Sequence, residues 1–176
     1  LRPLTDNMPK AMVPVAGKPM LQRVIENLAQ HGAHDIVVNV HHFGEQIIDF
    51  LADNNNFGQN IVVSDERQLL LDTGGGILAA KQFFDNEPFI VHNADILTTL
   101  DLTAMYKHHC ESNADATLLV KSRKTERYLL FDDNNQLHGW INKKTGETRP
   151  TDINASAHGC QEFAFGGVHI ISPSIF

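Results

Sequence analysis

The sequence predicts an α/β fold in which a mostly parallel central sheet is covered by helices on both faces. Short apolar runs typical of buried strands alternate along the chain with segments whose apolar residues recur at helical spacing. Strands separated by helices favour parallel pairing, because a helix on the face of the sheet returns the chain to the edge where the previous strand began. The 176 residues, 42% hydrophobic and 20% charged, suffice for one compact domain with a substantial core.

The elements up to residue 120 alternate between helix and strand. A helix should have Pro19 at its first position and end at His31-Gly32. A β-branched strand is expected over 36–40, and a helix with one apolar face over 46–52. The remaining elements are strands over 61–63, 88–91 and 116–120, a helix over 77–80, and a helix from the N-cap Asp101 to Ser112.

Beyond Tyr128 the pattern changes to a β excursion. Apolar runs at 129–131 and 137–141 flank a turn-rich stretch and predict a hairpin, and a longer strand is expected over 162–171. The polar stretch 142–159 is either a mobile lid or an ordinary surface loop. Because the chain starts without Met and stops soon after a segment that suits the start of a helix, we expect a fragment.

Charge and composition argue against several classes of function. A formal net charge of −7 and a pI near 5.7 do not suit a nucleic-acid-binding surface. The two cysteines have no CxxC spacing, so neither a disulfide framework nor a zinc site is expected, and the cytoplasm is the expected location. No apolar stretch is long enough to predict a membrane span. The oligomeric state stays open, a homo-oligomer included.

Other catalytic patterns are missing from the sequence. The pairs His41-His42 and His108-His109 lack the spacing of a zinc site, so exposed or capping roles are expected. No serine lies in a Gly-x-Ser-x-Gly elbow, which argues against nucleophilic hydrolysis. A dinucleotide-dependent oxidoreductase would need a Gly-x-Gly-x-x-Gly run, and the residues from Gly74 to Ala79 lack its last glycine.

A run of three glycines, followed by an acid at a strand end, indicates a nucleotide site. Gly74, Gly75 and Gly76 can adopt positive φ and open a helix whose N-terminal amides face a ligand. Asn93-Ala94-Asp95 then places a carboxylate near the same carboxyl edge of the sheet, where ligands bind in such folds. A lone carboxylate there suits Mg²⁺. The alternatives are a tight turn without a ligand for the glycines and an N-cap or turn role for Asp95.

An ordered set of motifs resembles the sugar-1-phosphate nucleotidyltransferases. The set consists of Leu1-Arg2-Pro3-Leu4-Thr5, Met8-Pro9-Lys10-Ala11-Met12-Val13-Pro14-Val15-Ala16-Gly17-Lys18-Pro19-Met20, Asp72-Thr73-Gly74-Gly75-Gly76 and Asn93-Ala94-Asp95. The Thr-Gly-Gly-Gly-Ile form looks most like N-acetylmuramate-1-phosphate uridylyltransferases and mannose-1-phosphate guanylyltransferase-like members. The resemblance implies a Rossmann-like three-layer sandwich with a β-hairpin excursion in its C-terminal half. It also implies one catalytic domain over 1–176 and the reaction of an NTP with a sugar 1-phosphate to give an NDP-sugar and pyrophosphate.

The resemblance also sets expectations about what lies outside the chain. A glycine-rich phosphate loop would precede Leu1, and a second metal-binding Asp would follow Phe176, so the literal fragment should be inactive. UTP is the favoured nucleotide. The alternatives are a GDP-mannose-type guanylyltransferase and a regulatory homologue that binds nucleotide sugar without turnover. Neither the sugar nor the base follows from a particular residue.

Two residues are expected to carry the chemistry. By resemblance to the Pro-Lys motif, Lys10 would contact the phosphates and stabilise charge at the α-phosphorus, since the reaction needs aligned anions and no covalent nucleophile. The alternative is a solvated surface lysine. Asp95 would hold Mg²⁺, with water and phosphate as the other ligands.

Residues around the glycines are expected to bind the nucleotide. Backbone groups at Thr73, Gly74 and Gly75 would approach it, and Glu66 lies where the family reads the base edge. A carboxylate only accepts hydrogen bonds, so Glu66 favours a base that presents an N–H, uracil and guanine alike. The alternative is a solvated loop charge, with Arg67 simply paired with it. Asn93 either bonds a ribose hydroxyl or caps the strand end.

The β excursion supplies the candidates for sugar binding, which are Trp140, Asn142, Glu162 and Gly167. Trp140 could pack against a hexose face, although a core role is favoured slightly for the only tryptophan. Glu162 is either an acceptor for sugar hydroxyls or a solvated strand-edge residue. Gly167 either opens space for the ligand or marks a bulge.

Overall fold

The computed structural model describes residues 2–67, 71–151 and 159–176. The chain forms two compact units, Leu1–Thr117 with Ile170–Phe176, and Leu118–His169. The expectation of a single catalytic domain stays a prediction. Leu1 and residues 152–158 of the lid or loop lie outside the described residues. Among the described helices, none combines the length and the hydropathy needed to cross a membrane.

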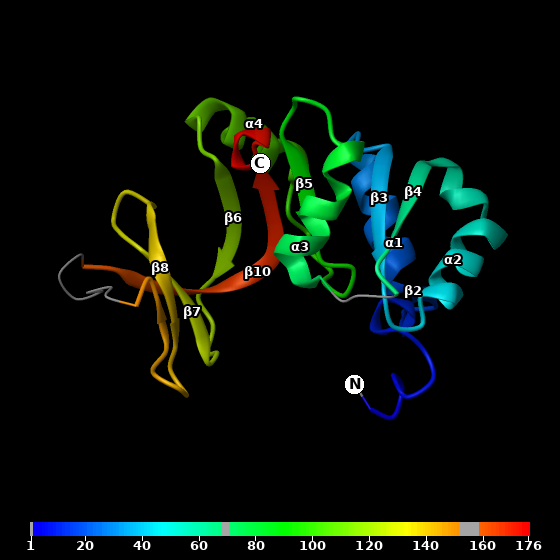
Figure 1. The fold of residues 1–176 in the computed structure, drawn as a ribbon, viewed down its shortest axis with the longest axis horizontal. Helices are drawn as coiled ribbons and strands as arrows, with labels where there is room; N and C mark the ends of the chain where they lie inside the picture. The colour runs from blue at the N-terminus through cyan, green and yellow to red at the C-terminus, as the bar shows by residue number, and fades with distance from the viewer. Residues whose placement is uncertain (1, 68–70, 152–158) are drawn as a thin grey trace. The chain divides into compact units, whose positions relative to one another are not determined.

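A parallel strand pair with two helices forms the N-terminal part of the first unit. β3 (Asp35–Val40) pairs with β4 (Asn60–Asp65) in parallel, from Asp35 opposite Asn60 to Val40 opposite Asp65. α1 (Met20–Gln30) leads into β3, and α2 (Gly44–Asp53) with η2 (Asn55–Gly58) connects β3 to β4 (Figure 1). The strands and helices predicted over this part are therefore confirmed, with somewhat wider bounds.

The first helix begins one residue later than expected. Pro19 pairs with Pro14 in the short antiparallel ladder of β1 (Pro14–Val15) and β2 (Lys18–Pro19), so Pro19 is the N-cap and Met20 the first helical residue. Its end at His31-Gly32 is as predicted, with Gly32 at a φ of 86°. A left-handed residue after the last turn is the usual way to end a helix, and glycine adopts that conformation without strain.

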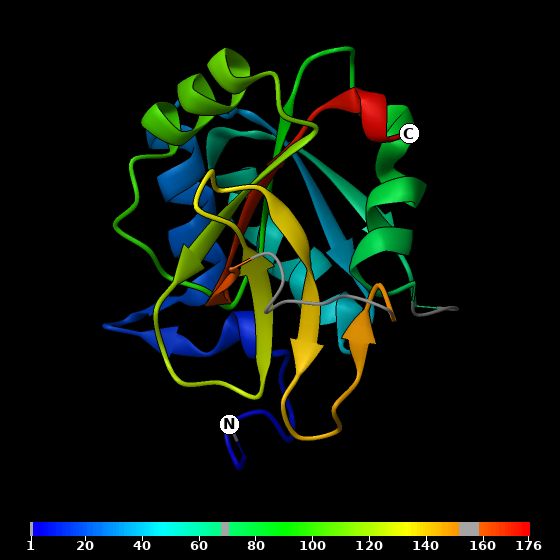
Figure 2. The same cartoon turned by 90° about the vertical axis from the view of Figure 1, so that its left-hand side faces the viewer.

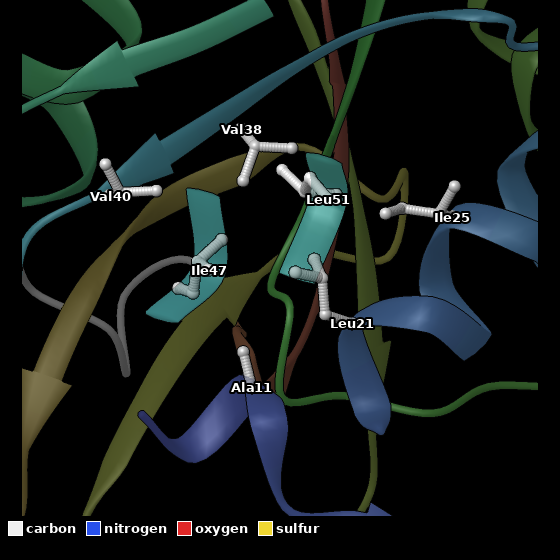
Figure 3. Packing of buried hydrophobic residues seen from close by; sticks show 7 residues of the cluster. All are labelled: Ala11, Leu21, Ile25, Val38, Val40, Ile47 and Leu51. Carbon is white, nitrogen blue, oxygen red and sulfur yellow. The ribbon is translucent and has the colours of Figure 1, made fainter. Parts of the chain in front are cut away.

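The helices and strands of this part enclose one hydrophobic cluster. Figure 3 shows its side chains pointing toward one another from η1 (Lys10–Met12), α1, β3 and α2. Its members are Ala11, Leu21, Ile25, Val38, Val40, Ile47 and Leu51. Burying a side chain of the size of valine, leucine or isoleucine contributes about 1.5–3 kcal/mol, so the larger members of this cluster stabilise the packing of α1 and α2 against β3.

The remainder of the first unit continues the alternation. It contains α3 (Asp72–Ala79), η3 (Ala80–Phe83), β5 (Phe89–His92), α4 (Leu102–Ser112) and η4 (Pro173–Ile175). The predicted N-cap of α4 is confirmed, because the Asp101 carboxylate accepts a hydrogen bond from the Ala104 N–H at 2.9 Å. β6 (Ala116–Lys121) begins in the first unit and ends in the second, and β10 (Gln161–Ile171) begins in the second unit and ends in the first.

The second unit is the predicted β excursion. β7 (Arg127–Phe131) and β8 (Leu137–Asn142) form the expected antiparallel hairpin, and their opposite directions are visible in Figure 2. β9 (Thr148–Arg149) pairs with the outer side of β8, and the first residues of β10 pair with β7. The stretch after Asn142 thus contains a short strand that the sequence did not predict.

His109 on α4 corrects the expectation that the histidine pairs are exposed or capping. Its ring is 1% exposed, with Nδ1 2.8 Å from the Thr117 hydroxyl and Nε2 2.9 Å from the Ser172 hydroxyl. Ser172 in turn donates to the Ala114 carbonyl at 2.9 Å. The neutral imidazole satisfies this network, with Nε2 donating and Nδ1 accepting. Burial is the main cause that lowers the pKa of His109, and His108 adds to it.

Acid should therefore destabilise the protein through this histidine. Since the pKa of His109 is lower in the folded state than its value near 6.5 in the unfolded chain, stability is complete above about pH 6.5 and falls as the pH drops through the folded-state pKa. Urea unfolding at pH 7.5 and 5.5 measures the difference. His109→Gln should show a smaller loss between these pH values than wild type. The exposed His108→Gln serves as the control, and equal losses in all three proteins would contradict the assignment.

Candidate active site

Lys10 and Asp95 form an ion pair within the first unit, although they lie 85 residues apart in the sequence. Lys10 Nζ donates to Asp95 Oδ2. The Lys10 side chain is 52% exposed and that of Asp95 28% exposed. A solvent-exposed pair of this kind contributes only about 0–1 kcal/mol to stability. The pair adds little to the fold, and it leaves both charges within reach of a ligand.

Apolar neighbours explain how these two residues meet. Lys10 opens η1, and the next residue, Ala11, is buried in the hydrophobic cluster. Asp95 follows Ala94, which packs against the same cluster. Because each charged residue is adjacent in sequence to one that packs on the core, the core places both of them at its edge.

Asp95 lies close to the predicted strand end. β5 ends at His92, and Asp95 follows in a turn that the Ile96 N–H closes by donating to the Asn93 carbonyl at 3.1 Å. The side chain of Asp95 faces Lys10, so its observed partner is a cation. The alternative of a turn residue agrees with this position, whereas that of an N-cap does not, because no described helix begins next to Asp95.

The three glycines do not form a turn in front of a helix, and this prediction is wrong. α3 already begins at Asp72, so Gly74, Gly75 and Gly76 lie within its first turns, and none of them has a positive φ. Glycine is required at Gly76 because side chains from outside the helix approach its backbone closely. A Cβ on Gly76 would lie 2.6 Å from both Asn39 Nδ2 and Glu66 Oε1, whereas a Cβ on Gly74 would meet nothing within 4 Å.

Two substitutions in this helix should therefore act in opposite directions. Gly76→Ala should destabilise the protein by about 1–3 kcal/mol, because the added methyl group overlaps packed atoms. Gly74→Ala should stabilise it by about 0.5–1 kcal/mol, because alanine loses less backbone entropy in a helix and meets no clash here. Urea denaturation midpoints measure both changes. A stable Gly76→Ala protein would show that the neighbouring side chains yield without cost.

Glu66 is buried, so the solvated alternative for this residue is wrong. It is 8% exposed, and its Oε1 accepts from Asn39 Nδ2 at 2.6 Å. Its backbone is held as well, since the N–H donates to the Val40 carbonyl at 2.8 Å and the carbonyl lies 2.7 Å from His41 Nδ1. Glu66 therefore follows β4 in a position that three contacts fix, one through its side chain and two through its backbone.

Arg67 does not pair with Glu66, so the alternative of a Glu66–Arg67 pair is wrong. Its guanidinium donates to Asp65, from Nε at 2.9 Å and from Nη2 at 2.6 Å, and it also pairs with Glu45. Arg67 holds the pKa of Asp65 below its usual value, chiefly through these side-chain hydrogen bonds. Within the described chain, the structure shows no cation paired with the Glu66 carboxylate.

Thr73 and Asn93 are both exposed. Thr73 lies in the first turn of α3, and Asn93 follows β5. In the part of the chain that is described, the Asn93 side chain makes no hydrogen bond, so no capping of the strand end is seen. That Thr73 and Asn93 contact the nucleotide stays a prediction.

The predicted sugar-binding residues all lie in the second unit, and each has a local role there. Asn142 is buried, and its Oδ1 accepts from the Lys144 N–H at 3.0 Å in the turn after β8. Glu162 pairs with Lys143. Gly167 has a φ of 83°, a conformation that favours glycine without reference to a ligand. Trp140 is half-buried on β8, opposite Leu129 of β7.

The side chains available as ligands around Asp95 determine which kind of metal ion could bind there. Among residues 2–67, 71–151 and 159–176, no group of three or more His, Cys, Asp and Glu side chains could hold an ion. A closed structural site is therefore not present in this part. A single carboxylate does suit Mg²⁺, which often takes one protein ligand and completes its shell with water and phosphate oxygens. Asp95 fits that ion when a phosphate ligand is present.

A pocket of about 260 Å³ lies elsewhere in the first unit, between α1 and the segment after β5. Arg23, Asn27, His92 and Leu97 are among its lining residues, and none of the residues predicted for the site lines it. The Arg23 guanidinium is engaged, since it donates to the Val15 carbonyl at 2.8 Å. Burial lowers the pKa of His92. Arg23 also donates from Nη2 to the Ala16 carbonyl at 3.0 Å, so two of its N–H groups are already used.

Sequence reasoning missed Asn39. The residue belongs to β3 and contacts Glu66 from the neighbouring strand end. Its signal was a single polar residue inside the β-branched run at 36–40, which by periodicity alone is only an exposed position on a strand. The structure thus brings Lys10 together with Asp95, and Glu66 together with Asn39 and Gly76.

Known proteins share sequence similarity with most of this chain. A family model described as "Nucleotidyl transferase" matches residues 1–131. A UTP--glucose-1-phosphate uridylyltransferase from Synechocystis is 31% identical over 191 residues, which cover 99% of this chain and 46% of that protein. An N-acetylmuramate alpha-1-phosphate uridylyltransferase from Caulobacter vibrioides is 38% identical over 187 residues, which cover 99% of this chain and 71% of that protein. The chain spans about half the length of the first of these relatives.

A solved structure shows the same fold. HddC from Yersinia pseudotuberculosis, complexed with GMP-PN, is 26% identical and superimposes with a TM-score of 0.70, over 99% of this chain and 72% of that protein. The expected Rossmann-like α/β fold is confirmed by this likeness and by the observed order of helices and strands.

Proposed function

This chain belongs to the nucleotidyl transferase family, and from that premise we propose that the protein transfers a nucleotidyl group from an NTP to a sugar 1-phosphate. The products are an NDP-sugar and pyrophosphate. The observation that carries the proposal is the ion pair of Lys10 and Asp95, a cation and a carboxylate that the core brings to one place and leaves accessible.

The proposed reaction needs alignment and charge screening. An oxygen of the sugar phosphate attacks the α-phosphorus, a new P–O bond forms there, and the bond to the departing pyrophosphate breaks. The Lys10 ammonium would contact phosphate oxygens and stabilise the charge that gathers at the α-phosphorus. Asp95 would hold Mg²⁺, which when bound supplies further screening of the phosphates. Glu66, Thr73, Gly74, Gly75 and Asn93 are proposed to contact the nucleotide.

UTP is the proposed nucleotide, because both curated relatives described above are named as uridylyltransferases. N-acetylmuramate 1-phosphate is the first sugar phosphate to test, because the Caulobacter relative is named for it. Trp140, Asn142, Glu162 and Gly167 remain the proposed sugar contacts. A guanylyltransferase is the second candidate, favoured by the GMP-PN complex of HddC. A location in the cytoplasm and assembly into a homo-oligomer stay predictions.

The test is pyrophosphate release by the full-length protein with Mg²⁺. UTP, GTP, dTTP, ATP and CTP are each combined with the 1-phosphates of N-acetylmuramate, mannose, glucose and N-acetylglucosamine. Release with one pair identifies both substrates. Release with GTP and mannose 1-phosphate would replace the uridylyl proposal with the guanylyl one. No release with any pair, together with measurable nucleotide-sugar binding, would favour a regulatory homologue that does not turn over substrate.

A further inference from the structure

The chain keeps its positive and negative charges largely apart. The second unit holds half of the 14 lysines and arginines but only 6 of the 21 aspartates and glutamates. All the other acidic residues belong to the first unit, where they outnumber the basic residues about two to one. The formal net charge of −7 therefore comes from the first unit, and one molecule can present surfaces of opposite sign.

The unpaired positive charges of the second unit lie in one short segment. Residues 121–127, which we call the basic segment, run from the last residue of β6 to the first residue of β7. The cations of the basic segment are Lys121, Arg123, Lys124 and Arg127, and all of them are exposed. The one carboxylate of the segment, Glu126, pairs with Lys144 at 3.8 Å. Within the described chain, no carboxylate forms an ion pair with any of the four cations.

Hydrogen bonds hold the backbone of the basic segment in place. The Thr125 N–H donates to the Tyr128 hydroxyl at 3.0 Å, and the Glu126 carbonyl accepts from the Lys143 N–H at 2.7 Å. The second bond connects the segment to the turn after β8, and Figure 2 shows both at the same end of the hairpin. Like charges held this close repel one another, so a negative partner would relieve the repulsion and would find the backbone already ordered.

α2 in the first unit carries an acidic face of matching charge. Glu45, Asp49 and Asp53 follow one another at intervals of four residues, so they lie on one side of the helix, and all three are exposed. Glu45 pairs with Arg67, whereas no described cation pairs with Asp49 or Asp53. Like charges at this spacing repel, and a carboxylate at the last residue, Asp53, also opposes the helix dipole. A positive partner would compensate for both effects.

We infer that the basic segment of one molecule binds the acidic face of α2 on a second copy of this chain. The two surfaces are opposite in sign and comparable in length, since the face from Glu45 to Asp53 spans about 12 Å of helix and the extended segment spans at most about 22 Å. An RNA or an anionic membrane fits less well, because most of the molecule that would approach it is negative.

The contact joins two different surfaces, so it is not a two-fold dimer. Each molecule that binds through its basic segment still has a free acidic face, and the association continues into chains or closes into a ring. Exposed charge pairs each contribute little to affinity, and salt screens them. The association is therefore weak and sensitive to ionic strength.

Sedimentation velocity of the full-length protein tests the inference. At about 10 mM salt the Debye length is about 30 Å, and the mean sedimentation coefficient should rise with protein concentration. At about 1 M salt the Debye length is about 3 Å, and the association constant should fall at least about tenfold.

Charge reversal identifies the two surfaces. Asp49→Lys/Asp53→Lys and Arg123→Glu/Lys124→Glu should each sediment at low salt as wild type does at high salt, because each variant leaves two surfaces of the same sign. An equimolar mixture of the two variants should associate again, since each then supplies the surface that the other lacks. Both variants should fold, because the changed side chains are exposed and lysine suits the C-terminal end of a helix. Thermal unfolding checks this.

Asp85→Lys/Glu87→Lys is the matched control, because it changes the net charge equally at two exposed acids of the first unit outside α2. It should associate as wild type does. The inference is overturned if wild type does not associate, if salt has no effect, if the control also loses association, or if the mixed variants stay apart. Binding of wild type to phosphatidylserine vesicles without self-association would also overturn it and would assign the basic segment to an anionic membrane.

Discussion

Replacing Asp95 with Asn should lower kcat of the full-length protein about a thousandfold. The amide keeps the shape of the side chain but loses the carboxylate charge that is proposed to hold Mg²⁺, and with that ion the screening of the phosphates, an effect of several kcal/mol on the transition state. Stability should change little, because the exposed pair with Lys10 is worth about 0–1 kcal/mol. Pyrophosphate release under saturating substrates measures kcat, and urea unfolding measures stability.

The control for this variant is Asp101→Asn. Asp101 caps α4 through its carboxylate, and asparagine caps equally well, so both activity and stability should be close to those of wild type. If Asp95→Asn retains more than about a tenth of the wild-type kcat, Asp95 is not the metal ligand and acts only as a partner of Lys10, since loss of a ligand costs several kcal/mol.

Replacing Lys10 with Met should lower kcat about a hundredfold, the cost typical of removing one preorganised charge from a developing anion. Methionine keeps the unbranched apolar stem, and the anchoring by Ala11 next to it is untouched. Lys18→Met is the matched control, because Lys18 is also an exposed lysine paired with a carboxylate, Glu26, at 2.8 Å. Equal activity of both variants would assign Lys10 to the solvated surface.

A double variant tests whether Lys10 and Asp95 act together. If Lys10 and Asp95 act on the same phosphates, the loss in Lys10→Met/Asp95→Asn should be smaller than the product of the single losses, because residues that work as a unit are not additive. A fully multiplicative loss would show that the two residues act on separate steps, although the structure pairs them.

Much of the fold could be predicted from local patterns. The apolar spacing of α1, the β-branched run of β3 and the cap at Asp101 each act over a few neighbouring residues, so periodicity and side-chain chemistry suffice. The hairpin of β7 and β8 followed from two apolar runs around polar turn residues. Lys10 and Asp95 were predicted from motifs, and Glu66 from its place in the resemblance, but neither signal names the partner of a residue.

The sequence by itself determined most of the helices and strands, and it named the charged residues that we propose for the site. Only the tertiary structure decided which of these residues contact one another. Lys10 reaches Asp95 across 85 residues because their neighbours share one core, and Gly76 is a glycine because Asn39 and Glu66 approach α3, not because a turn needs positive φ. His109 is buried for the same reason: α4 packs it against Thr117 and Ser172. Contacts of this kind depend on packing between distant segments, which no local pattern contains.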